Sequence, residues 1–223
     1  MKIRAIITGS TGMVGKGVLL ECLADPDVES VLVINRSPVG ITHDKVKEII
    51  LKDFFDLTEI ENNLQGYNAC FYCLGPISTG MSEKEYARIT HDMTLNFAKT
   101  LLKLNDEMTF CYVSGAGTDS TETSKMMWAR VKGRTENDLL ALPFKGAYMF
   151  RPAFIQPMKG VKSRTRSYRI FYALTKPLYP ILRRFNSFVT NSETVGQAMI
   201  MVARTGYHKN VLENSDISEI VLK

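Results

Sequence analysis

The sequence lacks several features that would set it apart from ordinary globular proteins. Its 223 residues include only four cysteines and one tryptophan, and no apolar run approaches the ~20 residues that span a bilayer. The N-terminus has no long apolar core of the kind that a secretory signal peptide needs. A chain of this length buries enough surface to fold without disulfides. We therefore expect a globular, cytoplasmic protein.

Two of the cysteines, Cys70 and Cys73, form a CxxC pair. The apolar residues around them predict a buried strand, in which residues three apart point to opposite faces. The sequence has no second CxxC, and its three histidines show no ligand spacing. We interpret the cysteines as buried thiols in a reducing compartment and expect no metal site.

Acidic residues are absent between Leu139 and Ser192, a segment that holds ten lysines and arginines. The positive excess of the chain, a formal net charge of +5, lies in this block. Aromatic residues interleave with the basic ones over residues 159–184. This pattern is typical of a lid over an anionic substrate, of a membrane or protein-binding surface, and of a nucleic-acid groove. We favour the lid, keep a membrane-surface or protein partner as the alternative, and rank nucleic acid last.

Short apolar segments alternate with helical patterns along the first 150 residues, which indicates a parallel sheet covered on both faces. Ser82 and Glu85 predict a capping box at the start of the second helix. The predicted fold is α/β, a doubly wound Rossmann sheet with strand order 3-2-1-4-5-6 and a small C-terminal lid. The expected strands are residues 2–8, 31–34, 48–51, 68–74, 109–114 and 146–150, and the expected helices are residues 13–23, 82–104, 124–142 and 192–204.

The chain divides into three parts on this interpretation. Residues 1–156 form the dinucleotide-binding core, and residues 157–191 form the basic lid, which Pro177 and Pro180 interrupt. Residues 192–223 provide a helix and a short tail with one strand, which complete the core.

The strongest local signal is a glycine-rich loop between the first strand and the first helix. Gly9 allows a sharp turn, Gly12 lets the backbone approach a pyrophosphate, and Gly15 lets the helix pack closely on the sheet. The free amides at the helix N-terminus bind the pyrophosphate. The expected phosphate-binding residues are Gly9, Ser10, Thr11, Gly12, Met13 and Val14.

The end of the second strand indicates which dinucleotide binds. Its residues are Asn35, Arg36 and Ser37, where NAD-binding proteins usually carry an acidic residue for the ribose hydroxyls. A guanidinium can stack on adenine and pair with a 2′-phosphate. The sequence therefore favours NADP(H) over NAD(H), with Asn35 and Arg36 among the cofactor-binding residues.

Several short motifs together resemble those of the atypical short-chain dehydrogenases/reductases, over residues 2 to about 215. The resemblance is strongest to the group of the Tat-interacting oxidoreductase, near the NmrA-like and epimerase/dehydratase branches. The motifs are Thr8-Gly9-x-Thr11-Gly12-x-x-Gly15, Asn35-Arg36, Asp53-Phe54, Cys73-Leu74-Gly75, Val131-Lys132-Gly133 and Arg151-Pro152.

The resemblance implies further cofactor contacts beyond the glycine loop. Asp53 and Phe54 are expected to border the adenine, and Pro152 is expected near the nicotinamide amide. The expected residues along the pyrophosphate and ribose are Cys73, Leu74 and Gly75.

The resemblance also implies a catalytic tyrosine four residues before a lysine, and a serine or threonine after the fifth strand. Lys132 is present, and Ser114 stands at the expected hydroxyl position, but Trp128 replaces the tyrosine. Indole has no titratable proton at neutral pH. Gly115 occupies a position where a second hydroxyl often stands. On this resemblance one catalytic position is altered, at Trp128, and Gly115 is a candidate for a second altered position.

Three interpretations of this altered site remain open. The first is an NADP(H)-dependent oxidoreductase that uses another acid, from Tyr86, Tyr168, Tyr172 or a water molecule, on a substrate that the sequence does not identify. The second is a catalytically vestigial protein that senses NADP(H) or binds a partner. The third is a scaffold without cofactor, which the intact glycine loop disfavours. Trp128 fits either a stacking role or simple packing over the nicotinamide pocket.

Overall fold

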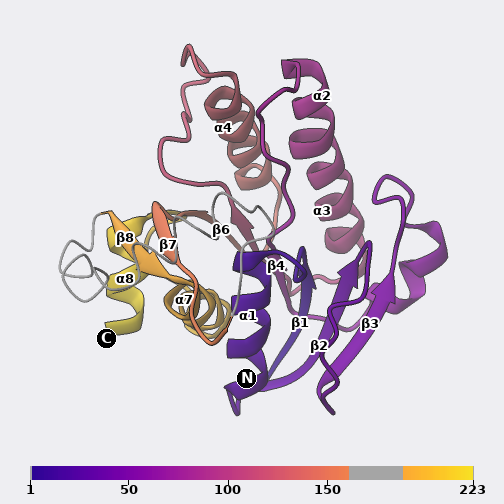
Figure 1. The fold of residues 1–223 in the computed structure, drawn as a ribbon. Coiled ribbons are helices and arrows are strands. Elements are labelled where there is room, and N and C mark those ends of the chain that lie inside the picture. The colour runs from indigo at the N-terminus through magenta and orange to yellow at the C-terminus, as the bar shows by residue number, and fades with distance from the viewer. Residues whose placement is uncertain (1, 161–187, 223) are drawn as a thin grey trace.

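The computed structural model describes residues 2–160 and 188–222, and a parallel sheet lies at its centre (Figure 1). Its seven strands follow the order β3-β2-β1-β4-β5-β6-β9, and every neighbouring pair is parallel. This confirms the predicted Rossmann order and extends it by one strand. The strands are β1 (Ile3–Thr8), β2 (Val28–Asn35), β3 (Val46–Ile50), β4 (Ala69–Tyr72), β5 (Thr109–Val113), β6 (Gly146–Arg151) and β9 (Val211–Glu213).

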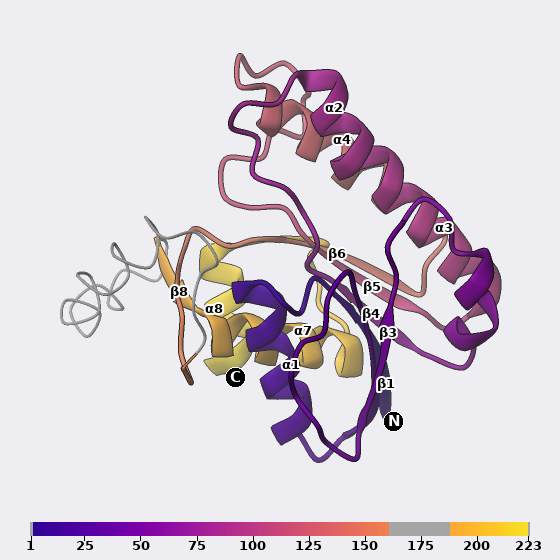
Figure 2. The ribbon, with the colours of Figure 1, turned by 45° about the vertical axis from the view of Figure 1, so that its right-hand side comes forward.

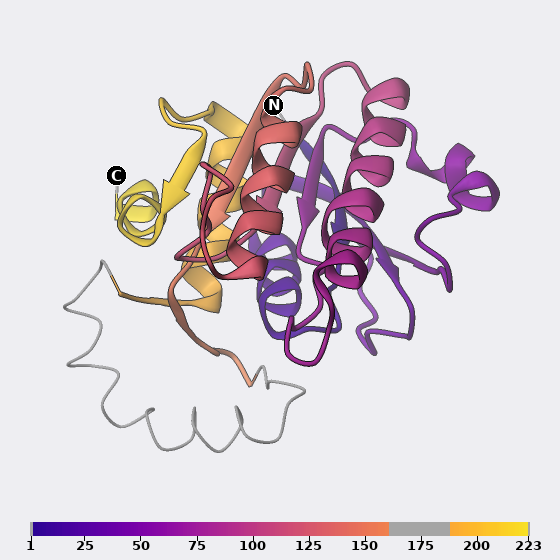
Figure 3. The ribbon, with the colours of Figure 1, turned by 90° about the horizontal axis from the view of Figure 1, so that it is seen from above.

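Helices cover both faces of the sheet and divide the core into two clusters. One face carries α1 (Met13–Ala24), α7 (Ser192–Thr205) and α8 (Asn214–Leu222). The other carries α3 (Met93–Leu104) and α4 (Met127–Leu140), which lie side by side in Figures 2 and 3. A short 3-10 helix, η1 (Thr58–Leu64), packs on the same side. Because both faces are covered, the central strands are continuous apolar runs, as the sequence predicted.

The first helix is fixed in place by close contact with α7. A methyl group on Gly17 would lie 2.6 Å from Cβ of Ser192, and one on Gly196 would lie 2.8 Å from Cγ of Glu21. These small residues let the two helices approach closely, so α1 and the loop that precedes it are held against the C-terminal part of the chain.

The predicted helix over residues 82–104 is present but irregular. It begins with α2 (Glu83–Ala87), continues through a π-helical turn, η2 (Arg88–Asp92), and ends with α3. The capping box is confirmed, because the Ser82 hydroxyl accepts from the Glu85 amide and the Glu85 carboxylate accepts from the Ser82 amide at 2.9 Å. Apolar spacing does not reveal the extra residue of a π turn, and the sequence did not predict it.

The C-terminal part contains more structure than the sequence predicted. The expected tail strand is β9, which pairs with β6 at the edge of the sheet. Helix α8 was not predicted, although Ile217, Ile220 and Val221 have helical spacing. Asp216 accepts from the Glu213 amide at 3.0 Å and so supports the turn that begins this helix.

A second sheet of two parallel strands, β7 (Phe154–Gln156) and β8 (Val189–Asn191), was also not predicted. These strands flank most of the predicted lid. Residues 161–187 lie outside the described part of the chain, so the lid and its limits at residues 157 and 191 stay predictions.

Candidate functional site

The glycine loop lies where the sequence predicted it, between the end of β1 and the N-terminus of α1. Gly9 has φ +69°, a conformation that favours glycine. A methyl group there would lie 2.7 Å from the Cys73 carbonyl oxygen, and one on Gly15 would lie 2.5 Å from the Gly9 carbonyl oxygen. Gly15 therefore lets the helix pack on the loop itself, where the sequence predicted contact with the sheet. Gly12 is the N-cap and makes no side-chain hydrogen bond to the first-turn amides, and such amides at a helix N-terminus can bind an anion.

The end of β2 is tied to this loop through a buried amide. Asn35 Nδ2 donates to Ser10 Oγ at 2.8 Å and to Glu48 Oε1 at 3.2 Å. The same Glu48 oxygen accepts from the Val39 amide at 2.9 Å. Asn35, expected as a cofactor contact, therefore positions the loop. Glu48, a residue that the sequence analysis missed, reaches the end of β2 from the next strand, and its carboxylate is engaged there.

A pocket of about 250 Å³ lies beside the ends of β2 and β4. It is smaller than the ~300–1,000 Å³ of a typical small-molecule site, which suits one ring of a larger ligand. The pocket brings together five predicted residues and five that the sequence missed. The predicted ones are Arg36, Asp53, Phe54, Leu74 and Gly75, and the missed ones are Lys52, Phe55, Pro76, Ile89 and Met93.

Two cations, Arg36 and Lys52, lie at this pocket, and Lys52 Nζ donates to the Arg36 carbonyl at 3.4 Å. Asp53 accepts from the Phe55 amide at 2.8 Å and so shapes the pocket wall. The sequence signal for Lys52 was its place directly before the Asp53-Phe54 motif.

The two CxxC cysteines lie on opposite faces of the sheet, as the sequence predicted. Cys70 belongs to the cluster beneath α3, and Cys73 packs against the cluster beneath α1. Burial raises the pKa of the Cys73 thiol to about 12, so it is neutral at physiological pH. Within residues 2–160 and 188–222, no group of three or more His, Cys, Asp or Glu is placed to hold a metal ion.

The expected catalytic residues meet at the end of β5. Lys132 Nζ donates to the main-chain carbonyl of Ser114. The Ser114 hydroxyl is buried and donates to the Phe150 carbonyl at 3.0 Å. Burial lowers the pKa of Lys132 to about 8, although the nearby Glu136 carboxylate raises it. The amine is therefore more acidic than an ordinary lysine, whereas the serine hydroxyl is committed to the backbone.

Trp128 reaches the same loop one helical turn before Lys132. Its ring lies 3.3 Å from the position of a methyl group on Gly117, a residue with φ +84°. Gly115 has φ +131°, which a serine would adopt only with strain. The Ala116 amide donates to the Pro152 carbonyl at 3.0 Å, which brings Pro152 next to this loop.

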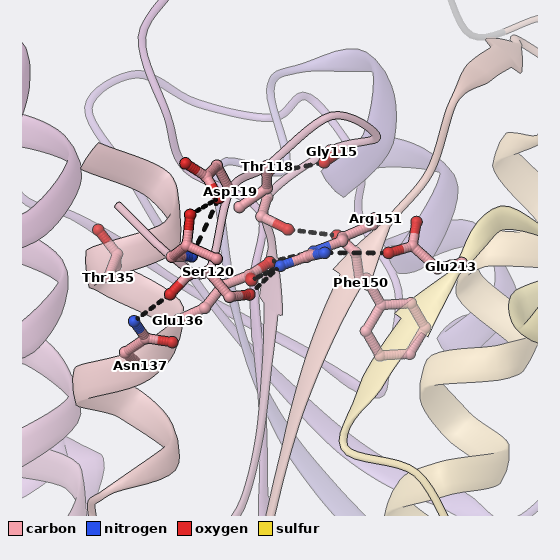
Figure 4. A network of polar contacts seen from close by, with 12 residues as sticks. Gly115, Thr118, Asp119, Ser120, Thr135, Glu136, Asn137, Phe150, Arg151 and Glu213 are labelled. Atoms are coloured by element: carbon pink, nitrogen blue, oxygen red, sulfur yellow. Dashed lines mark hydrogen bonds and ion pairs between the residues drawn. The ribbon is translucent and has the colours of Figure 1, made fainter. Parts of the chain in front are cut away.

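A network of side chains anchors helix α4 one turn beyond Lys132 (Figure 4). Arg151 Nε donates to Glu136 Oε1 at 3.1 Å, and a second guanidinium nitrogen bonds to Oε2. Arg151 also donates to Glu213 Oε1 at 3.0 Å and to Ser120 Oγ at 2.5 Å. The Glu136 side chain is fully buried, so these bonds offset the cost of removing its charge from water. The network joins β6, α4, β9 and the loop after β5.

That loop has a support of its own in Asp119. Its carboxylate accepts from the amides of Thr121, Thr123 and Ser124 at 2.7–3.0 Å. A methyl group on Gly133 would overlap the Asp119 carbonyl oxygen. The sequence analysis missed Glu136, Arg151 and Asp119 as supports of the site. The signals in the sequence were the basic residue at the end of β6 and an acidic residue one turn after Lys132.

Of the three tyrosines considered as alternative acids, the structure describes one. Tyr86 lies on α2, is 2% exposed, and has its pKa raised by burial. It does not face solvent in this structure. Tyr168 and Tyr172 lie outside the described residues.

Sequence comparison finds relatives among fungal proteins, and the chain matches no protein-family model. The protein named "FMP52, mitochondrial" from Debaryomyces hansenii is 27% identical over 201 residues, which cover 89% of this chain and 87% of that protein. Its namesake from Saccharomyces cerevisiae is 27% identical over 167 residues, 74% of this chain and 69% of that protein. Leucinostatins biosynthesis cluster protein T from Purpureocillium lilacinum is 31% identical over 140 residues, 61% of this chain and 51% of that protein.

The cytoplasmic location expected from the sequence is contradicted by the FMP52 relatives, which are named as mitochondrial. The sequence argument tested only for the apolar core of a secretory signal. Mitochondrial transit peptides are amphipathic and need no such core, so the argument could not exclude a mitochondrial protein. Among the described residues, no helix is long and apolar enough to cross a membrane.

Solved structures identify the fold. The Bordetella bronchiseptica enzyme WbmG, in complex with NAD and UDP, has a TM-score of 0.70 at 14% identity and covers all of this chain and 78% of that one. The ADP-L-glycero-D-manno-heptose-6-epimerase of Helicobacter pylori scores 0.68 at 14% identity, with 99% and 80% covered. A Saccharomyces cerevisiae short-chain dehydrogenase/reductase scores 0.68 at 12% identity, with 99% of both chains covered. The narrower resemblance to the Tat-interacting oxidoreductase group is not confirmed. The chain has the Rossmann fold of the short-chain dehydrogenases/reductases and NAD-dependent epimerases/dehydratases.

Proposed function

We propose that this protein binds NADP(H) in preference to NAD(H) and acts as an oxidoreductase on a carbonyl compound, slowed by the tryptophan at position 128. The glycine loop at the N-terminus of α1 carries the proposal. Its close contacts leave no room for side chains at Gly9 and Gly15 and present first-turn amides to a ligand. Amides at a helix N-terminus favour an anionic group such as a pyrophosphate.

The pocket beside the loop supports a dinucleotide as the ligand. In this proposal the adenine occupies the pocket bordered by Asp53, Phe54 and Leu74. The nicotinamide ribose then extends toward Lys132, at the end of β5. The fold supports the same proposal, because the structurally similar WbmG was solved in complex with NAD and UDP.

The preference for NADP(H) rests on charge at one end of the pocket. Arg36 and Lys52 are both exposed there and can pair with a 2′-phosphate. Glu48, the nearby acid, already accepts hydrogen bonds from Asn35 and Val39. A ribose hydroxyl would have to compete with these donors for the carboxylate.

A second candidate function is a sensor that binds NADP(H) without turnover. Two observations favour it, because Trp128 has no titratable proton and the Ser114 hydroxyl is bonded to the Phe150 carbonyl. The variant Trp128→Tyr distinguishes the two functions. If the site is otherwise competent, NADPH oxidation with a carbonyl probe should rise on restoring a phenol. No gain would favour the sensor.

Calorimetric titration of NADPH and NADH tests the proposal itself. Wild-type protein should bind NADPH, and Gly12→Val should abolish binding because a branched side chain would enter the phosphate site. Gly12→Ala is the graded control, since its methyl group would lie 3.2 Å from the Gly9 carbonyl oxygen and needs only a small adjustment. Circular dichroism should show that both variants fold. Full binding by folded Gly12→Val would refute the assignment of the loop.

A further inference from the structure

Reduction of a carbonyl requires a proton for the oxygen, and the loop after β5 limits where that proton can come from. Two side chains of α4 reach this loop, Trp128 at Gly117 and Lys132 at Ser114. They lie one turn apart and therefore on the same face of the helix. A carbonyl bound at this loop would meet an indole ring and an amine.

The loop hydroxyls of Ser114 and Thr118 are already engaged as donors. Ser114 Oγ donates to the Phe150 carbonyl at 3.0 Å, and Thr118 Oγ1 donates to the Gly115 carbonyl at 2.7 Å. Each hydroxyl has a single proton, so neither can donate to a substrate without breaking its bond. Lys132 differs, because an ammonium group has three N–H donors, and one of them suffices for the Ser114 carbonyl.

We propose that Lys132 is itself the general acid of this site and donates its proton to the carbonyl oxygen of the substrate. The proposal rests on the proposed function, since it requires a dinucleotide beside the same lysine. It assigns the lysine a catalytic role in addition to its expected contact with the ribose, and it explains how a site with tryptophan at position 128 can still turn over.

The surroundings of Lys132 suit this role. Burial lowers its pKa to about 8, near the range in which a catalytic acid works at neutral pH. Among residues 2–160 and 188–222, the charged groups that face the amine are Glu136 on α4 and, behind it, Arg151 on β6, which holds the Glu136 carboxylate. Glu136 raises the pKa of Lys132 and so keeps the amine protonated at neutral pH. It acts as a positioning residue.

The reaction balances with groups already named. The carbonyl carbon accepts a hydride, with its two electrons, from the reduced dinucleotide. The C=O π bond breaks, and the oxygen takes a proton from the Lys132 ammonium. The products are an alcohol, the oxidised dinucleotide and a neutral amine, which regains its proton from water.

Two measurements on the full chain test the proposal. The first needs no substrate: a nuclear magnetic resonance titration of 13C-lysine-labelled protein, in which Lys132→Arg identifies the Lys132 signal. Lys132 should titrate near pH 8, well below exposed lysines. The second is the pH profile of kcat/KM for NADPH oxidation with 4-nitrobenzaldehyde. The rate should be level below pH 8 and fall about tenfold per unit above it, because the protonated amine is needed.

The variant Lys132→Arg separates proton donation from binding. Arginine keeps the positive charge and can bond to the Ser114 carbonyl and the ribose, but it does not release a proton at neutral pH. The NADPH dissociation constant should change by no more than about threefold, whereas kcat should fall by about 100-fold or more. Glu136→Gln should move the break in the profile to lower pH.

Each contrary result has a definite meaning. Failure of wild-type protein to bind NADPH would refute the proposed function. If NADPH binds normally, three results would each refute the acid role alone. They are titration of Lys132 near pH 10, an undiminished kcat in Lys132→Arg, and no turnover of the probe.

Discussion

The two sides of the candidate site are built in different ways. The β1–α1 side is shaped by backbone, since Gly9 and Gly15 approach main-chain oxygens too closely for any side chain. The β5–α4 side is shaped by side chains, above all Arg151, which joins four elements through Glu136, Glu213 and Ser120. Backbone contacts of this kind tolerate few substitutions, whereas a side-chain network can be rebuilt one residue at a time. Trp128, which stands where the family resemblance predicts a tyrosine, is on the second side.

The strongest test of this contrast removes the centre of the network. Glu136→Ala should lower the free energy of unfolding by about 3–5 kcal/mol, because it leaves the Arg151 guanidinium in a largely buried site without its main partner. Urea denaturation measures the loss. Glu83→Ala is the matched control, since it removes the more exposed ion pair with Arg130 and should cost at most about 1 kcal/mol. Equal losses in the two variants would contradict the central role of Glu136.

A backbone contact on the same side provides the next test. Gly133→Ala should destabilise the protein by about 3 kcal/mol, since the new methyl group overlaps the Asp119 carbonyl oxygen and forces α4 away from the loop. Gly75→Ala is the control, because a methyl group on Gly75 would have no described atom within 4 Å beyond its chain neighbours. Thermal unfolding compares the two. If Gly133→Ala is as stable as Gly75→Ala, the loop at Asp119 moves away from the new methyl group at little cost in stability.

At the pocket beside the ends of β2 and β4, Arg36→Ala should weaken the proposed NADPH binding about tenfold or more. A charged hydrogen-bonded pair contributes about 1.5–3 kcal/mol. NADH lacks the phosphate, so its affinity should change little, and Lys84→Ala on α2 should leave both affinities unchanged. Calorimetry decides the matter, and an unchanged preference in Arg36→Ala would mean that this arginine does not select the cofactor.

The smallest expected effect is the loss of the stability contributed by Asp119 at acid pH. Hydrogen bonds from the Thr121 hydroxyl and from loop amides lower the pKa of Asp119 to about 2. A lowered carboxyl pKa stabilises the folded state above the unfolded value near 3.8 and loses this contribution as the pH falls toward 2. The stability difference between wild type and Asp119→Ala should therefore be constant above about pH 4 and shrink below it. Melting curves from about pH 2 to 6 measure it, and a difference independent of pH would contradict the assignment.

The same contrast explains what the sequence could predict. The glycine loop and the alternating strands are contiguous patterns, so the sheet order and the loop followed from local reasoning. Of the five predicted residues at the pocket, only Arg36 was inferred from the residues themselves, and the other four came from the resemblance to the short-chain dehydrogenases/reductases. The Arg151 network links residues 15 to 62 positions apart, and no local pattern connects Arg151 with Glu213. Glu48 and Lys52 were missed for the same reason, because each bonds to a residue at or just after the end of β2, 13 and 16 positions away. Helix α8 could have been predicted, since the helical spacing of its apolar residues is visible in the sequence.

The late position of β9 has a consequence for biosynthesis. The strand pairs with β6 at the edge of the sheet, yet it begins at Val211, 60 positions after β6 ends at Arg151. A chain emerging from the ribosome therefore exposes the edge of β6 while it waits for its partner. Unpaired strand edges are sites of aggregation. Until β9 is synthesised, the unpaired edge of β6 is open to pairing with other chains.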